Sequence, residues 1–406
     1  MNFKNNILFK QNQLLMICIS ILVFNLSYSI LVPIIPNFFD SLGMSTVMIG
    51  YIMSLYAVSK AICQVPSGMI SDLIGDKKVL VVCLSLLCMI LFSYTVFNIS
   101  IIISIIYILE GAVTGMAYPA IYSILSRSVD EGRRGESVGV FTTFSSLGVA
   151  IGPLLSGIII SIFKEYDLAF YVSSIGSLIT ALLVFINIKK ISTDIKIEKN
   201  DFNKSNNRIK NKLKYIGEYK LGWDIVMLGC IALLGDFVEG FMISIFPIYS
   251  NRILNLSITY VSVMLSVNFC IFSLSASFAG RISDKIGDKK QIVYSLIVIS
   301  LAFLSLFFVR PIYLFTIIML VESLAAVFLY SALQSALSKL GNNDIKGVIF
   351  GFVGTFQSIG LALGPIVSVF LYEYKSNCVF LGLSTISILV LFIFIFINRI
   401  ILKREV

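Results

Sequence analysis

Long apolar runs separated by short polar segments make up most of the chain. A helix needs about 20 apolar residues to cross the roughly 30 Å hydrocarbon core of a bilayer. Twelve runs approach or exceed this length, namely 14–38, 47–70, 79–97, 99–125, 137–163, 168–188, 223–249, 258–280, 291–309, 312–337, 347–371 and 377–398. The pattern predicts an all-α membrane protein with twelve transmembrane helices. The first run is too long for a secretory signal and lacks a small-residue cleavage site, so we expect it to remain as a helix.

Basic residues gather on one side of these predicted spans. The two terminal tails and every second loop hold 26 of the 31 Lys and Arg residues, whereas the opposite loops hold four. Loops on the cytoplasmic side carry such an excess. We therefore expect a multi-pass protein of the cell membrane with both termini in the cytoplasm. The net charge of +9 then fits a lipid surface, and we expect the bilayer, not a nucleic acid, as the partner.

Composition supports a lipid environment and excludes several kinds of chemistry. The chain is 58% hydrophobic and 13% charged, with about half the charge of an average soluble protein. Histidine is absent, which excludes imidazole metal sites and Ser/His triads. The seven cysteines show no CxxC or other metal-binding spacing. We expect no metal site, no cofactor and no enzymatic activity.

The polar stretch 189–222 divides the chain into two halves of six spans. It holds ten basic and four acidic residues. We predict an N-terminal six-helix bundle over 1–188, a cytoplasmic linker over 189–222 and a C-terminal six-helix bundle over 223–406. A basic linker suits an anionic membrane surface, and a regulatory binding segment is the alternative.

The two halves repeat one another at a constant offset, so that position 68 corresponds to position 280. Gly-Met-Ile-Ser-Asp-Leu-Ile-Gly-Asp-Lys-Lys at 68–78 returns as Gly-Arg-Ile-Ser-Asp-Lys-Ile-Gly-Asp-Lys-Lys at 280–290. Glu110 corresponds to Glu322 without a gap. Six-span halves repeated in one orientation are typical of transporters whose substrate site lies between the halves, near the middle of the membrane.

Three motifs resemble those of the major facilitator superfamily, in particular its twelve-span drug/proton antiporters. They are the signature loop between spans 2 and 3, the antiporter motif of span 5, and the proline pattern at the outer end of span 1. In that order they read Gly68-x-x-x-Asp72-x-x-Gly75-x-Lys-Lys, Gly148-x-x-x-Gly152-Pro153-x-x-Ser-Gly157, and Pro33 with Pro36. The resemblance implies two pseudo-symmetric halves in the major facilitator fold, a small-molecule substrate and alternating access.

The resemblance also implies a latch on the cytoplasmic side. Asp72 would meet the start of span 11 near Gly347, and Asp284 the start of span 5 near Gly135. An acid there interacts with the partial positive charge of a helix N-terminus. In the alternative, these residues only shape the turns. The predicted gating residues are Gly68, Asp72, Gly75, Asp76, Arg127, Gly280, Asp284, Gly287, Asp288 and Lys339.

Two positions depart from the family pattern, in which Arg follows the second motif glycine and Asp ends span 4. Here Asp76 occupies the first position and Arg127 the second. The other half repeats the exchange with Asp288 and Lys339. We therefore predict that each acid pairs with its base, and independently solvated charges are the alternative.

The span 5 motif removes side-chain bulk from one face of a helix. Gly148, Gly152 and Gly157 allow close packing, while Pro153 removes a backbone donor and permits a bend. By the resemblance, this motif favours export over import. In the alternative, it serves helix packing without directional meaning.

Five ionisable residues fall inside the predicted spans, where such groups are costly and are functional candidates. They are Lys60, Glu110, Asp236, Glu239 and Glu322. By the resemblance they share a cavity, as a pathway for protons and substrate. Crowded acids in a low dielectric favour retention of a proton, which a cationic substrate could displace. In the structural alternative, Lys60 neutralises Glu110 and Asp236 caps a turn near Gly235.

One family element is missing, and the aromatic residues allow two interpretations. The family carries Arg in span 4 where this chain has Tyr107, so the proton role of that Arg cannot be transferred. Several aromatic residues could form an apolar pocket that tolerates cations, or they could simply pack or face lipid. These are Tyr28, Tyr56, Tyr118, Phe237, Phe241 and Tyr330.

Together these features predict a secondary active transporter, acting as a monomer, that exports lipophilic, cationic compounds and draws energy from the proton gradient. Because histidine is absent, a carboxylate is the expected proton carrier. One alternative is an importer or exporter of a sugar, an organic acid or another metabolite. A second is a membrane sensor that does not transport, which should show a large folded part outside the membrane. The longest loop, 189–222, is too short for such a part.

Overall fold

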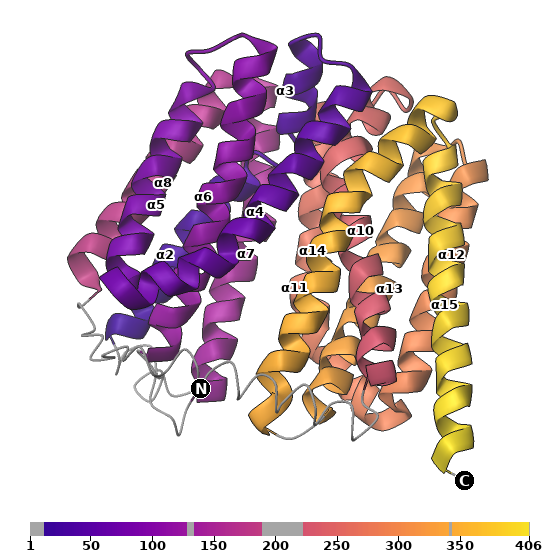
Figure 1. Cartoon of the computed structure of the whole chain (residues 1–406). Coiled ribbons are helices and arrows are strands. Elements are labelled where there is room, and N and C mark those ends of the chain that lie inside the picture. Colours follow the sequence, from indigo (N-terminus) through magenta and orange to yellow (C-terminus); the bar gives the residue numbers. More distant parts are fainter. Residues whose placement is uncertain (1–11, 128–133, 189–221, 341–342, 406) are drawn as a thin grey trace, which may run out of the picture. The chain divides into compact units, whose positions relative to one another are not determined.

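The computed structural model describes residues 12–127, 134–188, 222–340 and 343–405. Within these ranges the chain is almost entirely helical, and twelve helices have 18 residues or more (Figure 1). The first half contains α2 (Asn12–Ser29), α3 (Ile35–Ser41), α4 (Thr46–Ile74), α5 (Asp76–Ser93), α6 (Ser100–Arg127), α7 (Arg134–Phe163) and α8 (Asp167–Asn187). The second half contains α10 (Gly222–Arg252), α11 (Ile258–Ile286), α12 (Asp288–Phe308), α13 (Ile312–Lys339), α14 (Asn343–Tyr374) and α15 (Cys378–Glu405).

Ten of the described helices are long and apolar enough to cross a membrane. The two others among the twelve, α2 and α5, have 18 residues each. Helix α5 opens with Asp76, Lys77 and Lys78, so part of its length is charged. The observed helices follow the predicted apolar runs to within a few residues, except in the first run and at the ends of α11 and α15, which extend six and seven residues further.

The first predicted run is wrong as a single helix. Helix α2 ends at Ser29, and the short α3 begins only at Ile35. The two prolines of this region, Pro33 and Pro36, lack the amide hydrogen that a continuous helix would need. Turn-type backbone hydrogen bonds carry the chain through the break instead.

The internal repeat is visible in the helix bounds. Helices α4 and α11 begin and end at equivalent positions of the repeat, and so do α6 and α13. Gly75 separates α4 from α5 with a φ of +94°, and Gly287 separates α11 from α12 with a φ of +90°. Only glycine adopts such angles without strain. The repeated signature loop is therefore a repeated sharp turn between two helices.

The helices pack into two compact units. One unit contains residues 1–194 and 243–273, and the other contains 195–242 and 274–406. In the first, α4 packs on α6, α2 packs on α7 and α8, and α5 packs on α6 and α8. In the second, α12 packs on α13 and α15. Almost all of the predicted linker 189–222 lies outside the described residues, so the predicted division into two bundles stays a prediction.

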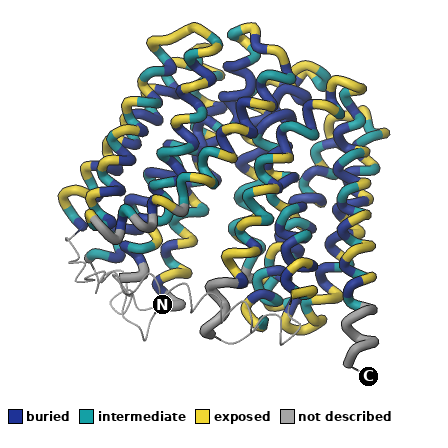
Figure 2. The backbone as a smooth tube through the Cα atoms, in the orientation of Figure 1, coloured by how far each residue is buried: buried dark blue, intermediate teal, exposed yellow. Residues whose placement is uncertain are grey.

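The long helices other than α2 carry both buried and exposed residues, whereas the described residues of α2 are all buried or half-buried (Figure 2). The largest fully buried side chains are aromatic, as with Phe141 and Phe170 in the first unit and Phe303 in the second. Large apolar side chains, including Ile186 and Leu274, are exposed. Such a surface is unfavourable in water and is the expected one where helices face lipid.

Candidate functional site

Glu110 is buried in the core of the first unit, where a tyrosine binds it. The Tyr94 hydroxyl donates a hydrogen bond of 2.6 Å to Oε2 of Glu110. Among the described residues Tyr94 is the hydrogen-bond partner of this carboxyl, and Lys60 makes no ion pair with it. The structural alternative, in which Lys60 neutralises Glu110, is therefore wrong.

Lys60 lies instead against two tyrosine rings. Its Nζ is 5.2 Å from the centroid of Tyr118 and 6.0 Å from that of Tyr28, within the range of cation–π attraction. The backbone of α6 comes close to α4 at this level, because a Cβ on Gly115 would be only 2.2 Å from the Lys60 carbonyl oxygen. The glycine thus places Tyr118, three residues along α6, beside the ammonium.

A polar network extends from these tyrosines. The Tyr118 hydroxyl donates to the side chain of Asn25 (3.1 Å), which in turn donates to Ser145 on α7 (2.7 Å). The Tyr56 and Tyr28 hydroxyls are 3.1 Å apart. Two of the predicted pocket aromatics, Tyr28 and Tyr118, therefore do lie against a cation, but that cation belongs to the protein itself.

Glu322 has no such partners. It lies on α13 in the second unit with 4% of its surface exposed. Among the described residues it accepts no hydrogen bond and makes no ion pair. A carboxyl group in this setting is costly to keep ionised, which makes Glu322 the most unusual of the predicted pathway residues.

Asp236 and Glu239 lie on α10. The Gln357 side chain, on α14, donates a hydrogen bond of 3.0 Å to Oδ2 of Asp236, and Glu239 is exposed. Helix α10 runs unbroken past Gly235, so Asp236 caps no turn there and that alternative is wrong. Nothing in the residue pattern had pointed to Gln357.

The remaining pocket aromatics of the second half have different surroundings. Phe237 and Phe241 are buried, and the Phe241 ring packs edge-on against Phe380 at 5.8 Å. Tyr330 is exposed. Phe237 and Phe241 therefore pack inside their own unit, while the role of Tyr330 stays a prediction.

The predicted cytoplasmic latch falls mostly outside the described part of the chain. The backbones of Gly68 and Asp72 belong to α4, but the Asp72 side chain and the surroundings of Gly135 and Gly347 are not described. Asp284 is exposed. The latch stays a prediction.

One of the two predicted ion pairs is confirmed. Nζ of Lys339 is 2.8 Å from Oδ2 of Asp288, and the Ser283 hydroxyl donates to Oδ1 of the same carboxylate (2.6 Å). In the first half, Asp76 is buried and accepts a hydrogen bond from Ser123 (2.9 Å). The Arg127 side chain is not described, so the other pair stays a prediction.

We expect the Asp288–Lys339 pair to be energetically coupled. Asp288→Lys alone places two cations together, and Lys339→Asp alone places two anions together. The double exchange should recover part of the stability lost in the singles, by about 0.2–1 kcal/mol because the lysine is exposed. Thermal unfolding of the four proteins measures this coupling, and strictly additive effects would contradict it.

An ion pair that sequence reasoning missed joins the two halves of the repeat within the first unit. The Arg252 guanidinium binds both carboxylate oxygens of Asp40, and its Nη1 donates to Thr46 (3.3 Å). Asp40 and Arg252 are 212 residues apart, so they occupy equivalent positions of the repeat. Opposite charges at one repeat position were the signal that could have revealed the pair.

We expect the ion pair between Arg252 and Asp40 to stabilise the folded protein modestly. Arg252→Ala removes the whole interaction and is expected to cost about 0.2–1 kcal/mol, while Arg252→Lys keeps the charge but loses the paired hydrogen bonds and should lie between. Arg310→Ala is the control, because Arg310 is exposed and makes no ion pair among the described residues. Equal unfolding temperatures for Arg252→Ala and the wild type would contradict the expectation.

The span 5 motif brings α7 against α2 and α11. A Cβ on Gly148 would be 2.5 Å from the Leu22 carbonyl oxygen. At the far end of the motif, Thr259 on α11 donates to the carbonyl of Gly157 (3.2 Å). Pro153 lies inside α7, which continues through it. Close packing is therefore present, whereas the directional meaning of the motif is not tested by this geometry.

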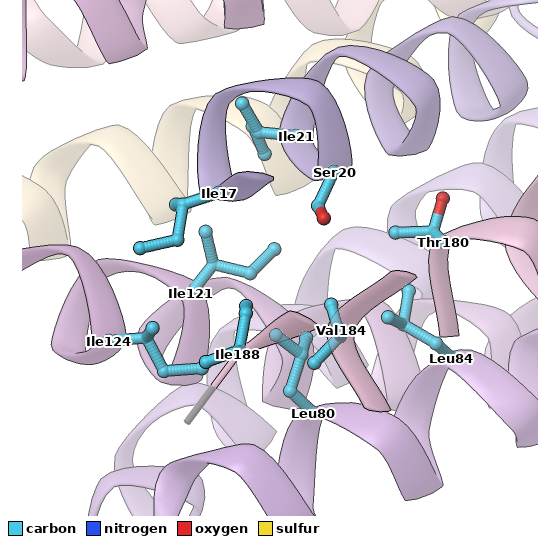
Figure 3. Close-up of a pocket in the computed structure, with 10 residues that line it drawn as sticks. All are labelled: Ile17, Ser20, Ile21, Leu80, Leu84, Ile121, Ile124, Thr180, Val184 and Ile188. Atoms are coloured by element: carbon cyan, nitrogen blue, oxygen red, sulfur yellow. The ribbon is translucent and has the colours of Figure 1, made fainter. Parts of the chain in front are cut away.

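A small cavity lies inside the first unit (Figure 3). Its walls are mainly isoleucine, leucine and valine side chains from α2, α5, α6 and α8, including Ile17, Leu84 and Val184. Ser20 and Thr180 turn their hydroxyls to carbonyls of their own helices. The space holds about one water molecule, so this cavity is a packing void, not a substrate site.

Comparison with known proteins identifies the family. The model of the Major Facilitator Superfamily matches residues 17–365 and 225–404. Multidrug resistance protein 2 of Bacillus subtilis is 24% identical over 374 residues, covering 89% of each chain. An uncharacterized MFS-type transporter of Methanocaldococcus jannaschii is 24% identical over 377 residues, covering 87% of this chain and 92% of its own.

Solved structures show the same fold. A bacterial homolog of the human lysosomal transporter Spinster, inward-facing and occupied, has a TM-score of 0.79 at 11% identity and covers 98% of this chain and 99% of its own. The human organic anion transporter MFSD10 has a TM-score of 0.65 at 16% identity, covering 95% and 99%. The chain is a multi-pass membrane transporter that belongs to the Major Facilitator Superfamily.

Proposed function

We propose that the chain exports lipophilic, cationic compounds across the cell membrane in exchange for protons. The observation that carries the proposal is Glu322, a buried carboxyl in a predicted span that has no hydrogen-bond or ion-pair partner among the described residues. Such a group costs less free energy when it holds a proton, so it can serve as a carrier that loads on one side and unloads on the other. Relatives named multidrug resistance proteins, at 22–24% identity, support the choice of substrate.

The exchange needs no group beyond the chain's own carboxyls. As the substrate leaves the cytoplasm, one proton or more moves inward, bound to a carboxylate as it crosses. Histidine is absent from the sequence, so the carboxyls of Glu110, Asp236, Glu239 and Glu322 are the natural candidates. By linkage, a cation that binds near an ionised carboxyl favours loss of the proton, and the proton favours release of the cation.

The experiment uses purified full-length protein in liposomes with an imposed pH gradient and a fluorescent lipophilic cation. We expect the dye to accumulate in the more acidic compartment and the accumulation to vanish when an ionophore collapses the gradient. A sodium gradient without a pH gradient should have no effect. Dye movement that ignores the proton gradient would refute proton coupling.

A second candidate, export of organic acids, is favoured by Lys60. Its ammonium lies over the rings of Tyr28 and Tyr118, and a positive charge inside a predicted span repels a cation and attracts a carboxylate or phosphate. The same liposomes loaded with an anionic dye distinguish the candidates. Transport of the anion that is lost in Lys60→Met, together with no transport of the cation, would favour the second candidate.

A further inference from the structure

The repeat-equivalent carboxyls Glu110 and Glu322 have different neighbours. Both are buried, and they occupy equivalent positions of the two halves. The donor to Glu110 is Tyr94, but the position equivalent to Tyr94 is occupied by Leu306, whose side chain has no hydrogen-bond donor. Two acids that the sequence makes equivalent are therefore chemically unequal.

Tyr94 is held firmly where it meets Glu110. It is the residue directly after α5 and has 1% of its surface exposed. Its ring stacks on Phe170 of α8 with centroids 4.9 Å apart, and Phe38 of α3 packs on it edge-on at 6.3 Å. Aromatic packing from two other helices thus fixes the ring, so the hydroxyl stays aimed at Oε2 of Glu110.

Two other tyrosines lie near Glu110 without donating a hydrogen bond to it. Tyr107 lies three residues before Glu110 on α6, Tyr56 packs against the neighbouring Gly111, and the two rings stack at 4.6 Å. The Tyr56 hydroxyl is engaged with Tyr28. Among the described residues, the hydrogen bond to Glu110 comes from Tyr94.

We propose that Tyr94 is a positioning residue that holds Glu110 in place and thereby leaves Glu322 as the carboxyl that exchanges protons during transport. The inference rests on the proposed proton-coupled export and deepens it. The Tyr94 hydroxyl must part from Glu110 before that carboxyl moves, and its donated hydrogen bond favours the ionised carboxylate, so Glu110 takes up a proton less readily. Glu322 has no such donor among the described residues. The repeat thus supplies two equivalent acids, and the hydrogen bond from Tyr94 distinguishes Glu110 from Glu322.

The test uses a hydrophobic carbodiimide, which adds to protonated carboxyls in apolar surroundings, on the full-length protein in liposomes. Mass spectrometry of peptides measures modification at Glu110 and Glu322 in the same sample. We expect Glu322 to react faster in the wild type. Tyr94→Phe keeps the ring and its packing but removes the hydroxyl, and it should raise the Glu110 rate by roughly fivefold while leaving the Glu322 rate unchanged.

The reverse variant supplies supporting evidence from the second half. Leu306→Tyr places a hydroxyl at the equivalent position and should slow the reaction of Glu322. An unchanged Glu110 rate in folded Tyr94→Phe overturns the proposal whatever the reverse variant does.

The pH profile of transport is a second measurement, and it should not change if Tyr94 has only a structural role. If Tyr94 acts through Glu110, adding Tyr94→Phe to Glu110→Gln should leave the pH profile of transport as it is in Glu110→Gln alone. A further shift in the double variant counts against the proposal. The carbodiimide labelling does not depend on transport. If the wild-type protein does not couple dye movement to protons, the proposed function is refuted, whereas the labelling rates still test the role of Tyr94.

Discussion

Replacing Glu322 by glutamine is expected to abolish proton-driven transport while leaving a folded protein in the membrane. Glutamine has nearly the same shape but no proton to exchange. The carboxyl is buried and has no partner among the described residues, so the change leaves no ion pair broken and no donor orphaned. Dye accumulation in liposomes with a pH gradient measures the loss.

Counterflow separates lost coupling from lost binding. Liposomes preloaded with unlabelled substrate, without a pH gradient, should still exchange it for labelled substrate in Glu322→Gln, because this exchange needs binding and alternation but no proton. Glu110→Gln, Asp236→Asn and Glu239→Gln are the matched variants, and we expect each to keep more proton-driven transport than Glu322→Gln. Wild-type accumulation in Glu322→Gln would show that this carboxyl does not carry the proton.

The apolar pattern and the repeat predicted most of the helical architecture, because both report on local and lipid-facing properties. Runs such as 258–280 and 312–337 fall within α11 and α13. The break at residues 30–34 escaped the same criterion. Hydropathy counts apolar side chains, whereas the break arises from the missing backbone donors of Pro33 and Pro36.

Charge comparison between the halves predicted one contact and could have predicted another. The exchange of signs at Asp288 and Lys339 correctly indicated an ion pair. The same comparison applied to Asp40 and Arg252 would have shown opposite charges at one repeat position.

The partners of the buried carboxyls could not be read from the sequence. Tyr94 reaches Glu110 across the turn between α5 and α6, and Gln357 reaches Asp236 from another helix. Which side chain faces which depends on the rotation of packed helices, and the residue pattern of an all-apolar helix leaves that rotation undetermined. The sequence correctly placed the acids inside membrane-spanning helices, but identifying their hydrogen-bond partners required the tertiary structure.

Alanine at two equivalent glycines should destabilise the protein strongly. A Cβ on Gly148 would lie 2.5 Å from the Leu22 carbonyl oxygen, and a Cβ on Gly360 would lie 2.2 Å from that of Leu233. Both obstacles are backbone atoms, so α2 and α7, or α10 and α14, must move apart. Overpacking of this kind costs about 1–3 kcal/mol, and thermal unfolding in detergent should show it for Gly148→Ala and Gly360→Ala.

The repeat offers matched controls and a way to decide what the span 5 motif does. Gly139 and Gly351 lie on the same two helices, also at equivalent positions of the repeat, and a Cβ there would meet nothing within 4 Å. Alanine should be neutral or stabilising by about 0.5–1 kcal/mol at both. Equal stability of Gly148→Ala and Gly139→Ala would refute the close packing of α2 and α7.

If Gly148→Ala and Gly360→Ala lose stability and transport in parallel, the motif acts through helix packing in both halves. A selective loss of export in Gly148→Ala, with stability matched to Gly360→Ala, would instead assign directional meaning to the first half alone.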